Sequence, residues 1–251
     1  MSNHRQARCL LVAVALIVAV HDASAGILEL SLPSVRDNTL FESDSGSVSN
    51  GAGRAVYVGD NFSLNTRRAM LFFDVAGRIP PGTTILAAEL RLHVSMVPVV
   101  TARNVGVHRV LADWGEGDSF AFGGTPVPAE PGDATWLHRF FPDVFWANVG
   151  GDFDASLTAV TAVADTGSYV WTSPQLVANV QSWVNNPTTE FGWMLRGEEG
   201  VPRSAREIDS RESLTPALRP VLWIRLDSPA VNVAEPWQAT SWSRTKAVYR
   251  R

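Results

Sequence analysis

Two runs of alternating side chains within residues 67–94 constrain the fold of this chain more than any other feature of its sequence. Side chains at every second position of a β-strand lie on the same face of the sheet. In each run one such face is apolar, and the two faces consist of Ala69, Leu71, Phe73, Val75, Ala88, Leu90, Leu92 and Val94. The opposite face of the second run carries Glu89, Arg91 and His93. The pattern predicts antiparallel strands with one dry face and one wetter face.

The connection between the two runs contains Pro80-Pro81-Gly82. Residues 77–84 are too many and too rich in proline for a two-residue hairpin turn. We therefore expect the two strands to belong to different sheets of a β-sandwich. The first run also places Met70 and Phe72 on the face where solvent is expected. That face is either covered by the irregular segment 111–159 or is itself a contact surface.

The first 25 residues have the three parts of a secretory signal peptide. A positively charged N-terminal region with Arg5 and Arg8 precedes the apolar stretch Cys9–Val20. Small residues then lead up to Ala25. Cleavage after Ala25 predicts a protein that is secreted or held at the cell surface without a membrane span. The alternative is an uncleaved membrane anchor. The single cysteine lies in this peptide, so the exported chain is expected to have no disulfide.

Residues 26–226 are expected to form one domain, and the polar residues 227–251 a disordered tail. The whole sequence has 21 Lys and Arg against 25 Asp and Glu, which is a formal net charge of −4. This mild acidity argues against a nucleic-acid partner.

One segment has the period of an α-helix. Ser173 suits its N-cap and Pro174 its first position. An apolar stripe follows at helical spacing, formed by Leu176, Val177, Val180, Trp183 and Val184. We therefore expect one short α-helix, from about Pro174 to Asn185, in an otherwise all-β chain that folds as a sandwich of two antiparallel sheets.

Acidic residues gather in two glycine-rich parts of segment 111–159, and they are Asp113, Glu116, Asp118, Asp152 and Asp154. Ca²⁺ prefers hard oxygen ligands and would hold long loops in place, so these five are the predicted ligands of a structural calcium ion. The alternative is that the carboxylates cap turns by accepting hydrogen bonds from backbone N–H groups. Zinc is disfavoured, because the histidines lack ligand spacing and no cysteine is left after export.

The candidates for ligand binding form two groups, which are Trp114, Trp136, His138 and Arg139 in segment 111–159, and Arg91 and His93 on the wetter sheet face. A flat aromatic ring is a platform for the apolar face of a sugar. The alternative is that the tryptophans pack beneath a long loop. Arginine can bind the carboxylate of an acidic sugar through two parallel hydrogen bonds. The alternative for the sheet face is ordinary solvation of charged side chains.

Several stretches, taken in order, form a further pattern. They are Asp37–Leu40, Val56–Gly59, Arg68–Val75, Ile79–Ile85, Ala88–Val94, Trp114–Gly117, Gly132–Trp136, Gly150–Asp154, Phe191–Trp193, Asp209–Glu212 and Arg219–Pro220. The series resembles the DNRLRE-domain family, secreted modules related to the alginate-binding carbohydrate-binding modules of family ninety-six. The resemblance extends from about Val35 to Leu226 and implies a jelly-roll-like β-sandwich. The chain departs from the family at Phe72, where a basic residue is usual, which argues against a uronate-binding patch on that face.

The resemblance and the residue types together predict a secreted, non-catalytic module that binds an extracellular or cell-surface polysaccharide, with acidic sugars among the candidates. No catalytic residue is predicted, because carboxylate pairs occur in any chain with this many acids and no Gly-x-Ser-x-Gly motif is present. Two alternatives stay open. One is a structural or adhesion protein of the envelope or extracellular matrix without sugar binding, and the other is a polysaccharide-degrading enzyme.

Overall fold

A computed structural model describes residues 26–228 of the chain. The predicted signal peptide and residues 229–251 of the predicted tail lie outside the described residues. The strands are β1 (Gly26–Pro33), β2 (Arg36–Phe41), β3 (Val48–Ser49), β4 (Ala55–Asp60), β5 (Thr66–Phe72), β6 (Thr84–Met96), β7 (Arg103–Arg109), β8 (Val127–Pro128), β9 (His138–Phe140), β10 (Val144–Phe145), β11 (Ala159–Val163), β12 (Gly167–Trp171), β13 (Trp193–Arg196), β14 (Arg206–Asp209) and β15 (Val221–Ser228). The helix α1 spans Pro174–Asn185, as expected from the sequence, and short 3₁₀ turns occur at Pro187–Thr189 and Pro216–Leu218.

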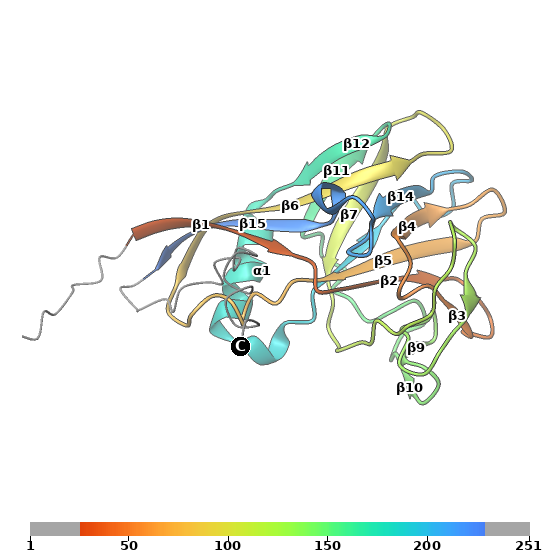
Figure 1. The fold of residues 1–251 in the computed structure, drawn as a ribbon, viewed down its shortest axis with the longest axis horizontal. Coiled ribbons are helices and arrows are strands. Elements are labelled where there is room, and N and C mark those ends of the chain that lie inside the picture. The colour runs from red at the N-terminus through yellow and green to blue at the C-terminus, as the bar shows by residue number, and fades with distance from the viewer. Residues whose placement is uncertain (1–25, 229–251) are drawn as a thin grey trace, which may run out of the picture. The chain divides into compact units, whose positions relative to one another are not determined.

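Most of these strands form one continuous antiparallel sheet (Figure 1). Their order is β1-β15-β6-β14-β4-β5-β13-β7-β11, with β12 also paired to β6 and β2 to β5. The sheet curls, so that its two halves enclose a core to which both contribute. The prediction of an all-β, sandwich-like fold with antiparallel sheets is confirmed.

Strand β4 belongs to both halves of the sheet. Residues 55–58 pair with β14, whereas Gly59 and Asp60 pair with β5. Gly59 has a φ of 84°, and a Cβ atom there would lie 2.9 Å from the carbonyl oxygen of Ser204. Only glycine combines this backbone conformation with so close an approach. The two sheets expected from the sequence are therefore continuous through β4.

The two alternating runs become β5 and β6, and their apolar faces are buried as predicted. The two strands do not pair with each other. Strand β5 pairs with β2, β4 and β13, whereas β6 pairs with β12, β14 and β15. The long proline-rich connection thus leads from one half of the sheet to the other, as its length predicted.

The main core lies between the two halves and is closed by α1, which packs on β6. The side chain of Ser173 caps the helix by accepting a hydrogen bond from the N–H of Leu176 at 2.9 Å. Trp183 of α1 lies against Trp193 of β13, with 4.6 Å between the ring centroids. Burying each large apolar side chain of this kind stabilises the fold by roughly 1.5–3 kcal/mol.

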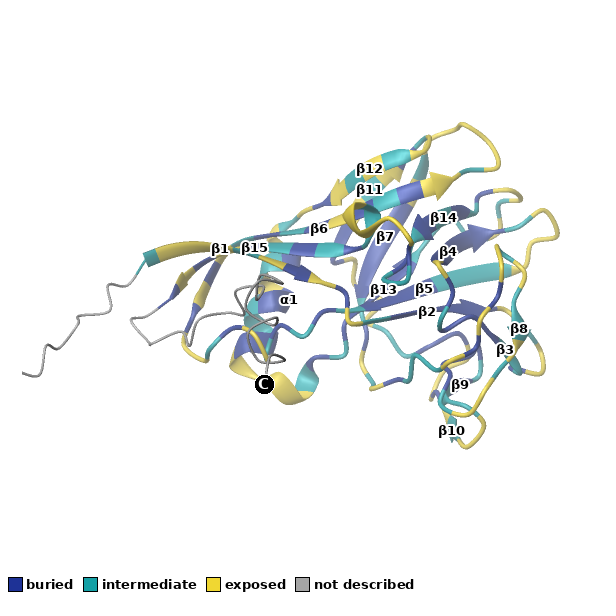
Figure 2. Ribbon diagram, viewed as in Figure 1, coloured by how far each residue is buried: buried dark blue, intermediate teal, exposed yellow. Residues whose placement is uncertain are grey.

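A second apolar cluster covers the outer face of β2, β5 and β13. It contains Leu40, Met70, Val110, Trp114, Ala134, Trp136, Trp146 and Met194. Phe72 is half-buried against the same cluster. Segment 111–159 therefore covers the unexpectedly apolar outer face of β5. In Figure 2 the exposed positions gather mainly in the connections and along the edge strands.

The last strand extends through Asp227 and Ser228, which pair with Thr84 and Gly26 respectively. These two residues were expected to open the tail, so the strand ends two residues later than the sequence suggested. Among residues 26–228, no helix has the length and apolarity required to cross a membrane.

Candidate functional site

The two tryptophans expected to stack on sugars are buried. Trp114 is fully buried, and its indole N–H donates a hydrogen bond to the carbonyl oxygen of Phe191 at 2.9 Å. Trp136 is 8% exposed and is covered by the guanidinium of Arg68, 4.7 Å from the ring centroid. The prediction that these rings offer a binding platform is wrong. They belong instead to the apolar cluster between segment 111–159 and strands β2, β5 and β13.

His138 and Arg139 also serve the packing of this segment. His138 is buried, with Nδ1 2.9 Å from Thr135 Oγ1 and its ring 4.2 Å from the ring of Phe145. Arg139 donates a hydrogen bond to the carbonyl oxygen of Asp113 at 3.2 Å. Three of the four loop residues predicted to bind ligand, Trp114, Trp136 and His138, are therefore buried, and Arg139 is partly exposed.

Arg91 and His93 lie on the outer face of β6, where the sequence placed them. Arg91 is paired with Glu89 at 2.8 Å and lies over the ring of Trp223, while His93 Nδ1 is 2.8 Å from Asp209 Oδ2. Together with residues of β12 and of the turn before β15, they line a surface cavity of about 260 Å³. The structure thus retains the sheet-face group of candidates.

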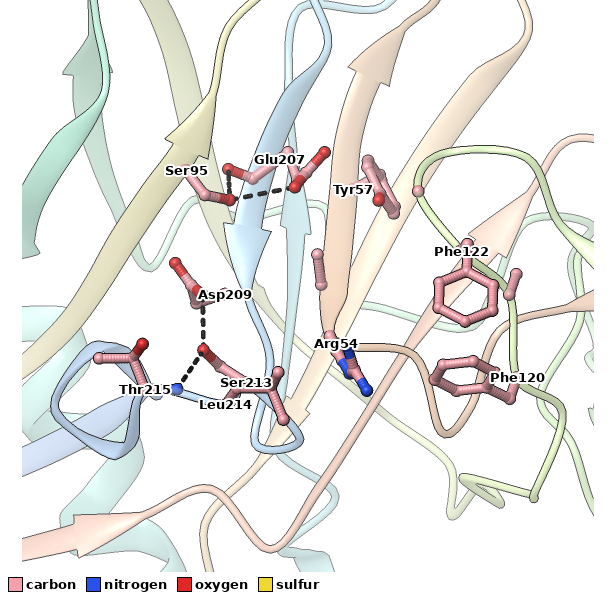
Figure 3. A pocket seen from close by; sticks show the side chains of 13 residues that line it. Arg54, Tyr57, Ser95, Phe120, Phe122, Glu207, Asp209, Ser213, Leu214 and Thr215 are labelled. Carbon is pink, nitrogen blue, oxygen red and sulfur yellow. Dashed lines mark hydrogen bonds between the residues drawn. The ribbon is translucent and has the colours of Figure 1, made fainter.

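Sequence reasoning missed a larger depression on the same outer face, over β4 and β14. Its first cavity holds about 260 Å³ and is lined by Arg54, Ala55, Tyr57, Ser95, Phe120, Ala121, Phe122, Gly123, Glu207, Asp209, Ser213, Leu214 and Thr215. Figure 3 shows Phe120 and Phe122 along one side and Asp209, Ser213 and Thr215 along the other. The two phenylalanine rings meet edge to face, with 4.8 Å between their centroids, and Phe122 is 79% exposed.

A second cavity of about 340 Å³ adjoins the first, because Tyr57 and Glu207 line both. Its other lining residues include Phe62, Arg67 and Arg203. We call the two adjoining cavities the outer groove. Their combined size falls in the range of roughly 300–1,000 Å³ that is usual for ligand sites.

Charged groups are concentrated in the outer groove. Burial, followed by the negative charge of Glu207, raises the pKa of the Tyr57 hydroxyl, which therefore stays protonated and able to donate. Arg67 donates to the carbonyl oxygen of Gly124 at 3.0 Å, but its buried Nε–H has no hydrogen-bond partner within residues 26–228. Burial lowers the pKa of the Arg67 guanidinium, and the negative charge of nearby Asp60 opposes this shift. A buried donor without a partner is costly unless a ligand or water satisfies it.

The five predicted calcium ligands do not meet in one place. Asp152 accepts hydrogen bonds from the N–H groups of residues 147 and 148, both at 2.8 Å. Asp154 accepts one from the N–H of residue 156 at 2.8 Å, which lowers its pKa. Asp113 is paired with Arg36 at 3.1 Å, and Asp118 is exposed. The alternative of turn capping is therefore correct for Asp152 and Asp154.

Glu116 alone of the five joins another carboxylate cluster. Its partners are Asp37 at the start of β2 and Glu212 in the turn after β14, with one oxygen from each of the three within 4.8 Å of the others. Within the described part of the chain, this is the only group of three metal-ligating side chains that lie this close. Its members are far apart along the chain, so no residue spacing in the sequence reveals this cluster.

A scan of the chain against protein-family models finds no matching family, and a search of curated proteins finds no match. The resemblance to the DNRLRE-domain family stays a prediction. Because one fold hosts many functions, a function for this chain rests on the chemistry of its surface.

Proposed function

We propose that this protein is a secreted, non-catalytic polysaccharide-binding protein whose ligand lies in the outer groove. The observation that carries the proposal is the combination, in one groove, of exposed phenylalanine rings with arginine, carboxylate and hydroxyl side chains. Saccharides present both an apolar ring face and a rim of hydroxyl groups. A site for them therefore needs an aromatic surface next to hydrogen-bonding groups that fix orientation.

The aromatic wall supplies the apolar contact. Phe122 is 79% exposed and Phe120 is 39% exposed, and Arg54 lies 5.9 Å from the centroid of the Phe120 ring. A sugar ring laid on Phe122 would cover one face of its exposed ring. Removing apolar area from water is favourable by about 25 cal/mol per Å².

The opposite wall supplies hydrogen bonds. Ser213 donates to Asp209 at 2.7 Å, and Ser95 donates to Glu207 at 3.2 Å, so these carboxylates are held in place but retain further acceptor capacity. Carboxylates of this kind can accept hydrogen bonds from the hydroxyl groups of a sugar. Arg67 and Arg203 at the other end of the groove suit the carboxylate of an acidic sugar, since arginine can bind it bidentately.

A ligand of several sugar residues fits the layout better than a single small molecule. Asp209 lines the outer groove, and its bonded partner His93 lines the cavity that contains Arg91. The groove and that cavity therefore follow each other across the outer face of β4, β14 and β6. The predicted candidates Arg91 and His93 would contact the end of such a chain.

The first test measures binding of the purified protein to arrays of neutral and acidic glycans, with Phe122→Ala as the variant. We expect the wild-type protein to bind, and the variant to bind at least tenfold more weakly, which corresponds to about 1.4 kcal/mol. The matched control is Phe145→Ala, which removes another exposed phenylalanine, 59% exposed, from β10 and away from the groove. We expect the control to bind like the wild type.

The proposal would be contradicted if both variants lost binding equally, or if the wild-type protein bound none of the glycans. The same samples distinguish the alternatives. Release of reducing ends or unsaturated uronates from a bound polysaccharide would make the protein an enzyme. Affinity for an envelope protein without any for sugars would make it a structural or adhesion protein.

A further inference from the structure

The carboxylate cluster of Asp37, Glu116 and Glu212 brings together three distant parts of the chain. Asp37 is fully buried in β2, Glu116 belongs to the loop that covers the second apolar cluster, and Glu212 lies in the turn after β14. Arg211 lies among them. Its guanidinium donates to the two oxygens of Glu116 at 2.6 and 2.7 Å, and its Nε is also 2.7 Å from Glu212 Oε1.

Two carboxylate oxygens of the cluster are buried without a hydrogen-bond partner in the described part of the chain. They are Asp37 Oδ1 and Glu212 Oε2. The other oxygen of Asp37 is satisfied, since it accepts from the backbone N–H of Arg211 at 2.8 Å. A buried anionic oxygen without a partner costs several kcal/mol, so native proteins rarely keep one unless an ion or proton satisfies it. Two in the same cluster indicate one missing positive group.

The charge count points in the same direction. Three carboxylates face one guanidinium, and no second cation is paired to the cluster within residues 26–228. The protein alone therefore leaves this site with an excess of negative charge that a divalent cation would match.

We propose that Asp37, Glu116 and Glu212 bind a calcium ion, with Asp37 Oδ1 and Glu212 Oε2 as its buried ligands. Calcium takes six to eight oxygens at about 2.3–2.6 Å, so oxygens on opposite sides of the ion are up to about 5 Å apart. One oxygen from each of the three carboxylates lies within 4.8 Å of the others, which fits this sphere. Glu116 and Glu212 are only partly buried, with side chains 14% and 21% exposed, which leaves a route for the ion and for water ligands.

Such an ion would fasten the loop over the second apolar cluster to β2 and to the turn after β14. Glu116 already takes part in this junction, because it accepts a hydrogen bond from the N–H of Asp37 at 2.8 Å and its carbonyl oxygen accepts one from Asn38 at 2.8 Å. The same turn carries Ser213, which lines the outer groove. The calcium proposal nevertheless stands apart from the proposed function, because it concerns stability and metal affinity.

The test uses the full exported chain, stripped of metal with a chelator, and follows heat denaturation and calorimetric titration with CaCl₂. We expect saturable binding, and a rise in Tm of about 5–10 °C when calcium is present at 100 times its Kd. Glu212→Gln should weaken calcium binding at least tenfold, and Asp37→Asn should do the same if it folds. Asp118→Asn is the matched control, since it removes an exposed carboxylate of the same loop outside the cluster, and it should leave calcium affinity unchanged.

Three results would overturn the inference. One is no heat of binding and no change of Tm with calcium in the wild-type protein. Another is a calcium response that survives Glu212→Gln but not Asp118→Asn, which would place the ion elsewhere. The third is a Glu212→Gln variant that is more stable than the wild type without calcium and binds calcium as tightly as the wild type does. That result would mean that Asp37 Oδ1 and Glu212 Oε2 share a proton instead of binding an ion.

Discussion

At the scale of single residues, the partly buried carboxylate of Glu199 is shared by two arginines. Glu199 lies between two arginines, with its carboxylate oxygens 2.8 Å from Arg68 Nε and 2.6 Å from Arg196 Nη2. Arg68 in turn covers the ring of Trp136 and donates to the carbonyl oxygen of Gly150 at 2.8 Å. One carboxylate thus fixes the arginine that covers the second apolar cluster.

The first prediction follows from the pKa of Glu199. Burial raises this pKa, but the hydrogen bonds from Arg196 and Arg68 outweigh burial and bring it down to about 2. The folded pKa is therefore below that of the unfolded chain, so this carboxylate stabilises the fold fully above about pH 4.5 and loses that contribution as the pH falls toward 2. We expect Glu199→Gln to lower the free energy of unfolding at pH 7 by about 1–3 kcal/mol.

Urea denaturation of wild type and Glu199→Gln at pH 7 and at pH 2.5 measures this difference. It should shrink at the lower pH, because the wild-type carboxylate is then partly protonated. A difference that is constant with pH would show that the charge of Glu199 is not what stabilises the pair of arginines.

At the scale of elements, α1 is the part that closes the core. Its Gln181 side chain accepts from the N–H of Ile85 at 2.8 Å and donates to the carbonyl oxygen of Thr83 at 3.0 Å, which joins the helix to the start of β6. On the inner side, Asn179 accepts from the indole N–H of Trp193 at 3.1 Å and from Thr158 at 2.9 Å. The helix therefore contacts both halves of the sheet.

The second prediction concerns the start of this helix. Ser173 accepts a hydrogen bond from the N–H of Leu176 and donates one to the carbonyl oxygen of Thr158. Ser173→Ala therefore removes both the helix cap and the hydrogen bond to Thr158, which lies just before β11. We expect a loss of about 0.5–2 kcal/mol in the free energy of unfolding. Chemical denaturation measures it, and Gln175→Ala, an exposed change in the first turn, should fall within about 0.5 kcal/mol of wild type.

At the scale of the whole described domain, the curled sheet decides which distant segments become neighbours. The outer groove takes Tyr57 from β4, Ser95 from β6, Phe122 from the long loop and Glu207 from β14. These strands lie side by side because β4 and β6 both pair with β14. The same strand β4 continues into the other half of the sheet at Gly59, which joins the two halves.

The third prediction tests that joint. Gly59→Ala places a Cβ 2.9 Å from the carbonyl oxygen of Ser204 at a φ of 84°, and we expect it to destabilise the fold by about 1–3 kcal/mol. Gly200→Ala is the matched control, because Gly200 has a φ of 81° but no atom within 4 Å of the added Cβ. Thermal unfolding of both should show the larger loss in Gly59→Ala. Equal losses would mean that the close approach at Ser204 relaxes at no cost.

Much of the fold was predictable from the sequence, because the signals were local. The period-two runs of β5 and β6 and the capped apolar stripe of α1 depend on residues a few positions apart, and these elements form as expected. The length of the connection between the two runs correctly predicted that β5 and β6 do not pair with each other. Of the ligand-binding residues predicted, only Arg91 and His93 were placed correctly on an open face, again because alternation along one strand determines orientation.

The sequence by itself therefore determined strands β5 and β6, the helix α1 and which face of each is apolar. The tertiary structure alone decided that Trp114 and Trp136 are buried, and that Asp37, Glu116 and Glu212 meet. The physical reason is the separation along the chain of the residues that interact. Periodicity records how neighbours along the chain share one face, whereas the burial of a loop tryptophan and the meeting of distant carboxylates depend on how strands pair across the sheet, and residue spacing carries no record of that.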